Sequence, residues 1–158
     1  MSVKNETTSF LTFKLDEEVF GINVQQVLEI VEVTPITKVP GSPKCMRGVI
    51  NLRGSILPVI DTRAKFKMTD TLYTVDTCII VLSINNNNET LLVGALVDAV
   101  QKVVELPAEN IQPSDSMGVL YEEKFITGMG KTDQGFIMIL DVEKVFSVQD
   151  AYATPVNL

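Results

Sequence analysis

Residues 47–63 read RGVINLRGSILPVIDTR, and this stretch indicates the fold class of the chain. Two apolar runs, 49–52 and 56–60, are separated by the short segment 53–55. Apolar runs of this length on either side of turn-forming residues predict a strand, a tight turn and a second strand. Pro58 in the second run has no backbone N–H to donate, so we expect that strand at a sheet edge or with a bulge.

The rest of the chain repeats this pattern of short apolar runs bounded by turn residues. The runs that we predict as strands lie at 10–15, 19–22, 77–84, 91–97, 125–127 and 136–140. The asparagine-rich segment 85–88 and the segment 128–135 are the expected hairpin turns. Helical spacing of apolar residues occurs only at 24–33, and a second short helix is expected at 141–146. The chain is therefore predicted to be mainly β.

A weak internal repeat relates the two halves of the chain. Three positions recur with a shift of 73 residues, first as Gly21, Val24 and Val27 and then as Gly94, Val97 and Val100. In both halves an aspartate is followed five residues later by a phenylalanine, as Asp61 and Phe66 and then as Asp141 and Phe146. We interpret Asp61 as the cap of a turn or helix. Each copy is too small for a deep core, so we expect two small β-barrels that share one.

The composition excludes several classes of function. The 158 residues contain 13 Lys and Arg against 20 Asp and Glu, a formal net charge of −7, and no His. This balance offers no excess of cations to displace phosphate counterions, so we expect no nucleic-acid partner. Without histidine there is no Ser-His-Asp or Cys-His pair and no mixed Cys/His zinc site. Cys45 and Cys78 lack the spacing of a metal site and are expected as small core residues, so we predict neither metal nor cofactor.

Three motifs typical of ligand-binding or catalytic proteins are incomplete. Residues 128–132, GMGKT, match the end of a phosphate-binding loop, but Phe125 stands where that loop needs glycine, and a strand follows instead of a helix. Asp61 lacks the acidic partner of a phospho-acceptor. The adjacent glutamates at 17–18 and 122–123 lie beside turns, and their spacing alone neither supports nor excludes a glycosidase-like pair. No catalytic centre is predicted.

Arg53 and the segment 24–30 each have two interpretations. Arg53 lies at a turn between apolar strands, where it either stays solvated or braces carbonyl groups or a carboxylate through directed hydrogen bonds. Val24, Val27 and Ile30 are spaced to line one face of a helix. Such a face either packs in the core or forms a groove for a helix of a partner.

The stretch 47–63 resembles the central signature of the CheW family, the bacterial chemotaxis coupling proteins. Further segments follow in the family's order at 10–13, 20–22, 27–30, 37–40, 94–98, 125–130 and 139–141. The resemblance implies a CheW-like domain at 9–148 made of two intertwined five-stranded SH3-like β-barrels with a shared hydrophobic core and short helices. A flexible N-terminal segment at 1–8 and a C-terminal tail at 149–158 would flank it.

The resemblance also implies a non-catalytic adaptor. Members of the family couple the cytoplasmic tips of methyl-accepting chemoreceptors to the CheW-like regulatory domain of the histidine kinase CheA. Because residues 1–9 lack the apolar region of a secretory signal, we expect a cytoplasmic protein, recruited through its receptors to arrays at the inner face of the cell membrane. Two alternatives stay open: a module that binds only another CheW-like domain, and an enzyme that works without histidine.

Site residues carry over from the family by position. The positions that would line a groove for the receptor are Leu11, Val24, Val27, Glu29, Ile30 and Val100. The positions near the surface that would face the kinase are Val39, Pro40, Gly48, Arg53 and Gly54. Glu18 and Met117 match a second edge that pairs with another such domain in ring assemblies.

Overall fold

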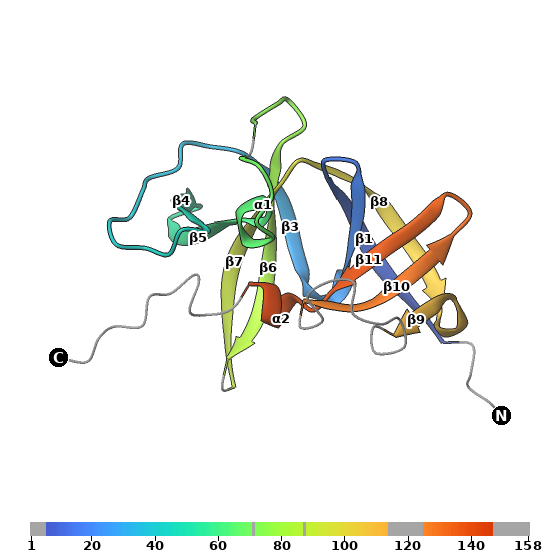
Figure 1. Cartoon of the computed structure of the whole chain (residues 1–158). Coiled ribbons are helices and arrows are strands. Elements are labelled where there is room, and N and C mark those ends of the chain that lie inside the picture. Colours follow the sequence, from blue (N-terminus) through green and yellow to red (C-terminus); the bar gives the residue numbers. More distant parts are fainter. Residues whose placement is uncertain (1–5, 71, 87, 114–124, 147–158) are drawn as a thin grey trace.

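The computed structural model describes residues 6–70, 72–86, 88–113 and 125–146 (Figure 1). The strands are β1 (Thr7–Leu15), β2 (Glu18–Asn23), β3 (Val27–Glu32), β4 (Met46–Leu52), β5 (Ser55–Asp61), β6 (Cys78–Asn86), β7 (Glu89–Val97), β8 (Ala99–Pro107), β9 (Ile111–Pro113), β10 (Ile126–Thr132) and β11 (Gly135–Leu140). The helices are α1 (Thr62–Lys65) and α2 (Val142–Val145), with 3₁₀ turns η1 (Val24–Gln26) and η2 (Ala108–Asn110). The chain is mainly β, as predicted.

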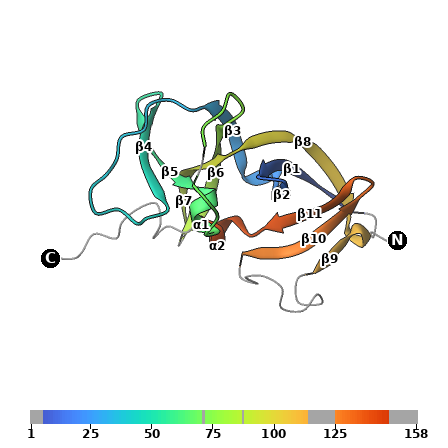
Figure 2. The same cartoon turned by 45° about the horizontal axis from the view of Figure 1, so that its top comes forward.

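The strands form two sheets that lie side by side (Figures 1 and 2). The first sheet has the order β8-β1-β2-β11-β10-β9, and the second has the order β3-β6-β7-β5-β4. The first sheet therefore has six strands instead of the expected five, because the short strand β9 pairs with β10 at its edge. Apart from β9, the two sheets have equivalent strand orders.

The internal repeat is confirmed, and its two copies are interleaved. Each sheet contains one parallel pair that joins the halves of the chain, β2 with β11 and β5 with β7. Gly21 and Gly94 occupy equivalent places in these pairs, opposite Ile139 and Val59. Strands β1 and β2 thus complete a sheet with β8, β10 and β11, while β6 and β7 complete one with β3, β4 and β5. Neither copy builds a sheet alone.

The aspartates of the repeat start the two helices in the same way. The Asp61 carboxylate accepts hydrogen bonds from the backbone N–H groups of Arg63 (3.0 Å) and Ala64 (3.3 Å), which confirms that it is a cap. The Asp141 carboxylate accepts from the backbone N–H of Lys144 at 3.3 Å, so the predicted helix after this residue is confirmed as α2.

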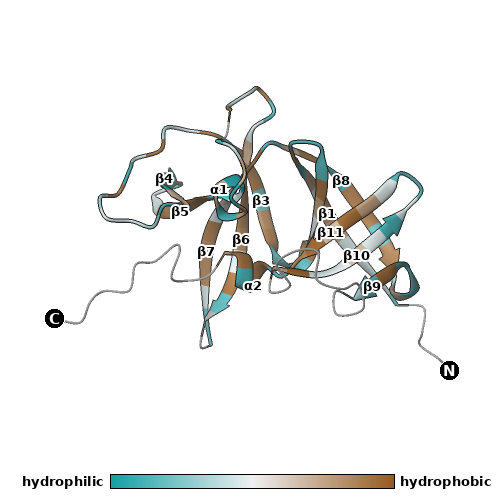
Figure 3. Cartoon of the chain, in the orientation of Figure 1, coloured by the Kyte–Doolittle hydropathy of each residue, from teal (hydrophilic) through white to brown (hydrophobic). Residues whose placement is uncertain are grey.

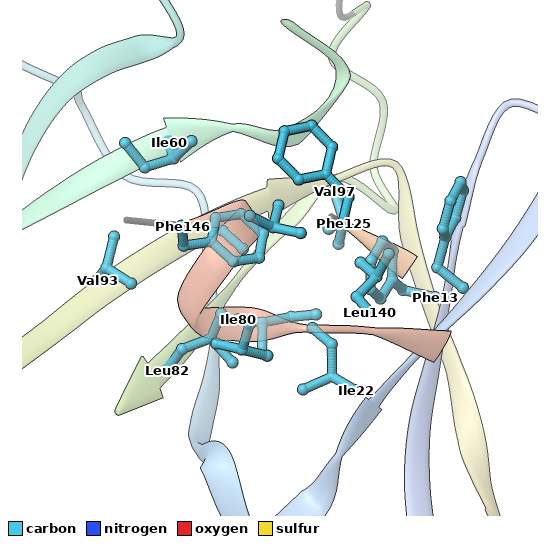
Figure 4. Packing of buried hydrophobic residues seen from close by; sticks show 14 of the residues in the cluster. Phe13, Ile22, Ile60, Ile80, Leu82, Val93, Val97, Phe125, Leu140 and Phe146 are labelled. Carbon is cyan, nitrogen blue, oxygen red and sulfur yellow. The ribbon is translucent and has the colours of Figure 1, made fainter. Parts of the chain in front are cut away.

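A large apolar cluster, the shared core, lies between the sheets. Its buried residues are Leu11, Phe13, Leu15, Phe20, Ile22, Ile60, Ile80, Leu82, Ile84, Val93, Ala95, Val97, Phe125, Ile126, Leu140, Val142, Val145 and Phe146. Figure 4 shows side chains from both sheets pointing toward one another, and Figure 3 shows that apolar residues fill long stretches of the strands while hydrophilic residues gather at turns and strand ends. In β6 the alternation sends Ile80 and Leu82 into the shared core and Ile79 and Val81 into a second cluster.

Three expectations about local structure are wrong or need correction. Residues 24–33 form a 3₁₀ turn and strand β3 instead of a helix. Strand β5 is an inner strand and not an edge strand, but its ladder with β4 does carry a bulge, on the β4 side between Met46 and Gly48. Its pairing with β7 begins at Val59, just after Pro58, so the missing N–H does not interrupt that ladder. The turns expected over 85–88 and 128–135 are both shorter. Strand β6 extends through Asn86 and pairs it with Glu89, and β10 extends through Thr132 and pairs it with Gly135.

Candidate protein-binding surfaces

Four of the six expected receptor-binding residues lie where the two sheets meet. Leu11 is buried in the shared core, and Val24, Val27 and Val100 pack against it while partly exposed. Val27 pairs with Leu82 across β3 and β6, and Val100 pairs with Phe13 across β8 and β1. The structure therefore brings these residues from both halves of the sequence to one boundary.

The edge strands β3 and β8 extend this boundary with exposed apolar side chains. Ile30 on β3 pairs with Ile80, and Val103 on β8 pairs with Leu11; both partners belong to the shared core. Directly opposed residues in a ladder point to the same face, so Ile30 and Val103 project toward the junction. They nevertheless remain 44% and 54% exposed. We call Val27, Ile30, Val100 and Val103 the junction strip.

A bulge in each edge strand places the strip residues on one face. The pairing of β3 with β6 shifts register between Val27 and Glu29, and that of β8 with β1 shifts between Leu11 and Phe13. An extra residue in a strand brings positions i and i+3 to the same face, which an unbroken strand would not do. Val103 was absent from the expected site, although it lies 73 residues after Ile30 and the repeat provides the signal to find it.

Glu29 turns away from the strip and pairs with Arg53. It lies opposite Val81, whose side chain packs in the second cluster, so Glu29 projects from the other face of β3. Arg53 donates to both carboxylate oxygens, with Nη1 3.2 Å from Oε1. This bidentate contact lowers the pKa of Glu29 and raises that of Arg53. Arg53 thus braces a carboxylate, one of the two interpretations of its sequence position.

The turn that carries Arg53 has an unusual backbone. Arg53 and Gly54 connect β4 to β5 with φ values of 49° and 91°. Positive φ at both residues is typical of a type I′ hairpin, in which Asn-Gly is favoured and a long side chain at the first position is not. The Gly54 N–H donates to Asn51 Oδ1 at 2.7 Å and closes the turn. The turn holds the exposed guanidinium beside β3.

The other expected kinase-facing residues lie near the start of β4. Gly48 allows a close approach, because a Cβ there would lie 2.1 Å from the carbonyl oxygen of Thr37. That approach permits two backbone hydrogen bonds of 2.9 Å between Thr37 and Val49. Val39 and Pro40 are exposed and line a surface hollow together with Lys38, Lys44 and Arg47. Gly48 therefore shapes this surface through the backbone.

Glu18, at the start of β2, lines a separate hollow with an apolar floor. The floor includes Phe20, Phe66 and Phe125, whose rings are in contact with centroids 5.5 Å and 5.7 Å apart. Met117, which was expected beside Glu18, lies outside the described residues. The role of this edge in assembly is therefore still a prediction.

The described residues contain no group of three or more His, Cys, Asp or Glu side chains able to hold a metal ion. Within the same residues no helix has the length and apolar character needed to cross a membrane. The surfaces described above are instead an apolar junction between two sheets and a polar turn with a fixed arginine. Exposed apolar surface of this kind is typical of protein-binding modules.

Comparisons with known proteins agree with this class. A family model, the CheW-like domain, matches residues 9–150. The chemotaxis protein CheW of Klebsiella aerogenes is 35% identical over 89% of this chain and 82% of that protein. The probable chemotaxis protein CheW of Rhizobium etli is 34% identical over 96% of both chains. The crystal structure of the scaffolding protein TtCheW from Thermoanaerobacter tengcongensis superposes with a TM-score of 0.80 at 32% identity, covering 92% of this chain and 96% of that one.

The chain therefore belongs to the CheW family. The fold expected from the resemblance is confirmed by the structural match. The named relatives and the scaffolding protein together identify a scaffold or adaptor role in chemotaxis.

Proposed function

We propose that this protein couples the cytoplasmic tip of a chemoreceptor to the CheW-like regulatory domain of the histidine kinase CheA, without catalysis of its own. The observation that carries the proposal is the junction strip, which exposes apolar side chains from two edge strands over the shared core. A receptor tip is a helical hairpin, and the apolar side of a helix is the ligand that such a strip fits.

The kinase would bind the surface around Arg53 and Gly54, together with Val39 and Pro40. Arg53 and Val39 are exposed, and the Arg53 turn lies beside the face of β3 opposite to the strip. Because Ile30 and Glu29 project from opposite faces of one strand, the two partners would have separate contact areas. Both can therefore be bound at once, which an adaptor requires. Through the receptor the protein would reach arrays at the inner face of the membrane.

Binding of the purified chain to each partner tests the proposal. We expect wild-type protein to retain both a receptor cytoplasmic fragment and the kinase regulatory domain in a pull-down, and to form a ternary complex. Retention of the kinase domain alone would favour the alternative of a module that pairs only with other CheW-like domains. Retention of neither would overturn the coupling function.

A substitution in the strip separates the two contacts. Val27→Glu places a charge on the partly exposed strip, so we expect weaker receptor binding with kinase binding unchanged. Phe136→Glu is the matched control, because Phe136 is 59% exposed on β11 outside the strip. If Val27→Glu lowered both affinities together with the thermal midpoint, Val27 would act in the core and not in binding.

A further inference from the structure

Arg63 is a buried cation at the boundary between the two sheets. Its side chain is 7% exposed, and its Nη1 donates to Asp16 Oδ1 (2.8 Å) and to Asp98 Oδ2 (2.7 Å). Its Nε donates to the Thr69 carbonyl oxygen at 3.0 Å, and Nη2 donates to Thr69 Oγ1 at 2.8 Å. The guanidinium is therefore held from three directions. Arginine is suited to this, because its donors form a rigid planar fork.

The partners of Arg63 come from different parts of the fold. Arg63 lies in α1, which follows β5 of the second sheet, whereas Asp16 lies in the β1–β2 turn of the first sheet. Asp98 joins β7 of the second sheet to β8 of the first. Asp98 Oδ2 also accepts from the backbone N–H of Asp16 at 2.7 Å, so the three groups form one closed network. The network ties the first sheet to the second.

An equivalent but weaker contact lies on the other side of the pseudo-symmetric fold. Glu143, in α2 after β11 of the first sheet, occupies the place of Arg63, because both residues follow the capping aspartate by two positions. Its Oε2 accepts from Gln26 Nε2 (3.4 Å) in η1 and from the Asn85 backbone N–H (3.2 Å) in β6 of the second sheet. Glu143 is exposed, so water competes for these hydrogen bonds. The two halves thus place a cross-sheet clamp at the same point, and only that of Arg63 is buried.

We propose that Arg63 is a positioning residue that sets the orientation of the two sheets and thereby keeps the junction strip in its binding geometry; this rests on the proposed receptor contact. Asp98 precedes β8 and is two residues from Val100, so the clamp acts at one end of the strip. The strip is built from both sheets and needs their relative placement. Arg53 and its partner Glu29 both lie in the second sheet, so their contact does not depend on how the two sheets are placed relative to each other.

The orientation of the sheets can be measured on the full chain by backbone residual dipolar couplings. We expect the couplings of the two sheets in wild-type protein to fit one alignment tensor. The variant Arg63→Met removes the hydrogen-bond donors and roughly keeps the length of the side chain. When the couplings of each sheet in this variant are fitted to the wild-type structure, we expect a different alignment tensor for each sheet. Glu17→Gln is the matched control, because Glu17 lies beside Asp16 in the turn between β1 and β2. Its side chain is 93% exposed, and among the ion pairs described it contacts only Lys14. A single unchanged tensor in Arg63→Met would overturn the proposal, whether or not the receptor binds.

Affinities then distinguish positioning from general stability. If Arg63→Met leaves a tenth of the molecules in the binding geometry, receptor affinity falls about tenfold, because apparent affinity scales with the competent fraction. We expect kinase affinity to stay within about twofold, since that surface lies on one sheet. An equal loss of both affinities would overturn the proposal. If Arg63→Met does not fold, Asp16→Asn can replace it, because Asp98 still pairs with Arg63 in that variant. We expect the same pattern with a smaller loss of receptor affinity. No loss of receptor affinity would count against the clamp.

Discussion

Arg53 combines an unfavourable backbone conformation with a specific side-chain contact. Its φ of 49° suits asparagine or glycine better than arginine, and its guanidinium is paired with Glu29. The sequence predicted the turn and offered bracing of a carboxylate as one role for the arginine. It did not identify Glu29 as the partner, because the two residues are 24 positions apart and β3 was expected to be a helix.

Replacement of this arginine separates turn stability from binding. We expect Arg53→Asn to leave the thermal midpoint unchanged or to raise it, because Asn-Gly is a preferred type I′ sequence. Kinase affinity should fall, and the pKa of Glu29 should return toward its ordinary value of 4.5 as the guanidinium is lost. The lowered pKa means that the wild-type pair is complete above pH 4.5 and weakens as acid protonates Glu29 below it. Thermal melting checks the midpoint, and NMR titration checks the pKa of Glu29. A clear fall in the midpoint of Arg53→Asn would contradict the expected stability of the turn.

Gly48 is the second residue whose backbone matters more than its chemistry. We expect Gly48→Ala to lower the free energy of unfolding by about 1–3 kcal/mol, because a Cβ would collide with the Thr37 carbonyl and φ is 145°. Gly41→Ala is the control, since Gly41 also has a positive φ but nothing lies within 4 Å of an added Cβ. Urea unfolding of both variants measures the difference. Equal losses would show that the close approach to Thr37 contributes nothing.

At the scale of elements, β3 shows where sequence patterns mislead. Its apolar residues have the i, i+3 spacing of a helix, yet the spacing arises from a 3₁₀ turn followed by a bulged edge strand. β-branched residues, which are Val and Ile here, favour the strand. The pairing with β6 is a tertiary contact that the local pattern does not encode. Val27 and Ile30 still lie on one face at the junction, because a bulge and a helix both place positions i and i+3 on the same face, whereas Glu29 points away from it.

The equivalence of β3 and β8 makes Val103 a test of the junction strip. We expect Val103→Glu to weaken receptor binding by about tenfold or more, through a buried or uncompensated charge in the contact. The fold should be unaffected, because Val103 is 54% exposed. Isothermal titration against a receptor fragment checks the effect. The Phe136→Glu variant is the control, because Phe136 is exposed to a similar degree. If the receptor affinity of Val103→Glu were unchanged, the receptor would contact the β3 side of the junction strip and not β8.

At the scale of the whole molecule, the repeat predicted two copies with one core, and the structure shows that the copies exchange strands. The sequence did not show this exchange, because strand order depends on which edges pair after the chain collapses. Strands β8 and β9 were also missed. In β8 the bulge breaks the alternation of apolar residues, and the three residues of β9 give too short a pattern. The resemblance provided the overall fold, while the residues alone provided its mainly β character and its approximate symmetry.

Interleaved copies predict that the two sheets unfold together. We expect Phe13→Ala to lower the free energy of unfolding by about 3–5 kcal/mol, because Phe13 is fully buried in the shared core. Amide hydrogen exchange should accelerate equally in both sheets. The exposed Phe136→Ala should change stability by less than about 0.5 kcal/mol. Faster exchange in the first sheet alone would contradict a shared core.

Receptor-dependent control of the kinase tests whether one chain bridges the two partners through separate surfaces. Receptor-containing membranes, CheA and this protein are combined, and kinase autophosphorylation is measured with and without attractant. We predict control with wild-type protein and with Phe136→Glu, and loss of control with Val103→Glu and with Arg53→Asn, each of which should still bind one partner. Full control by either of these two variants, or control without this protein, would show that the chain does not couple the two partners through these surfaces.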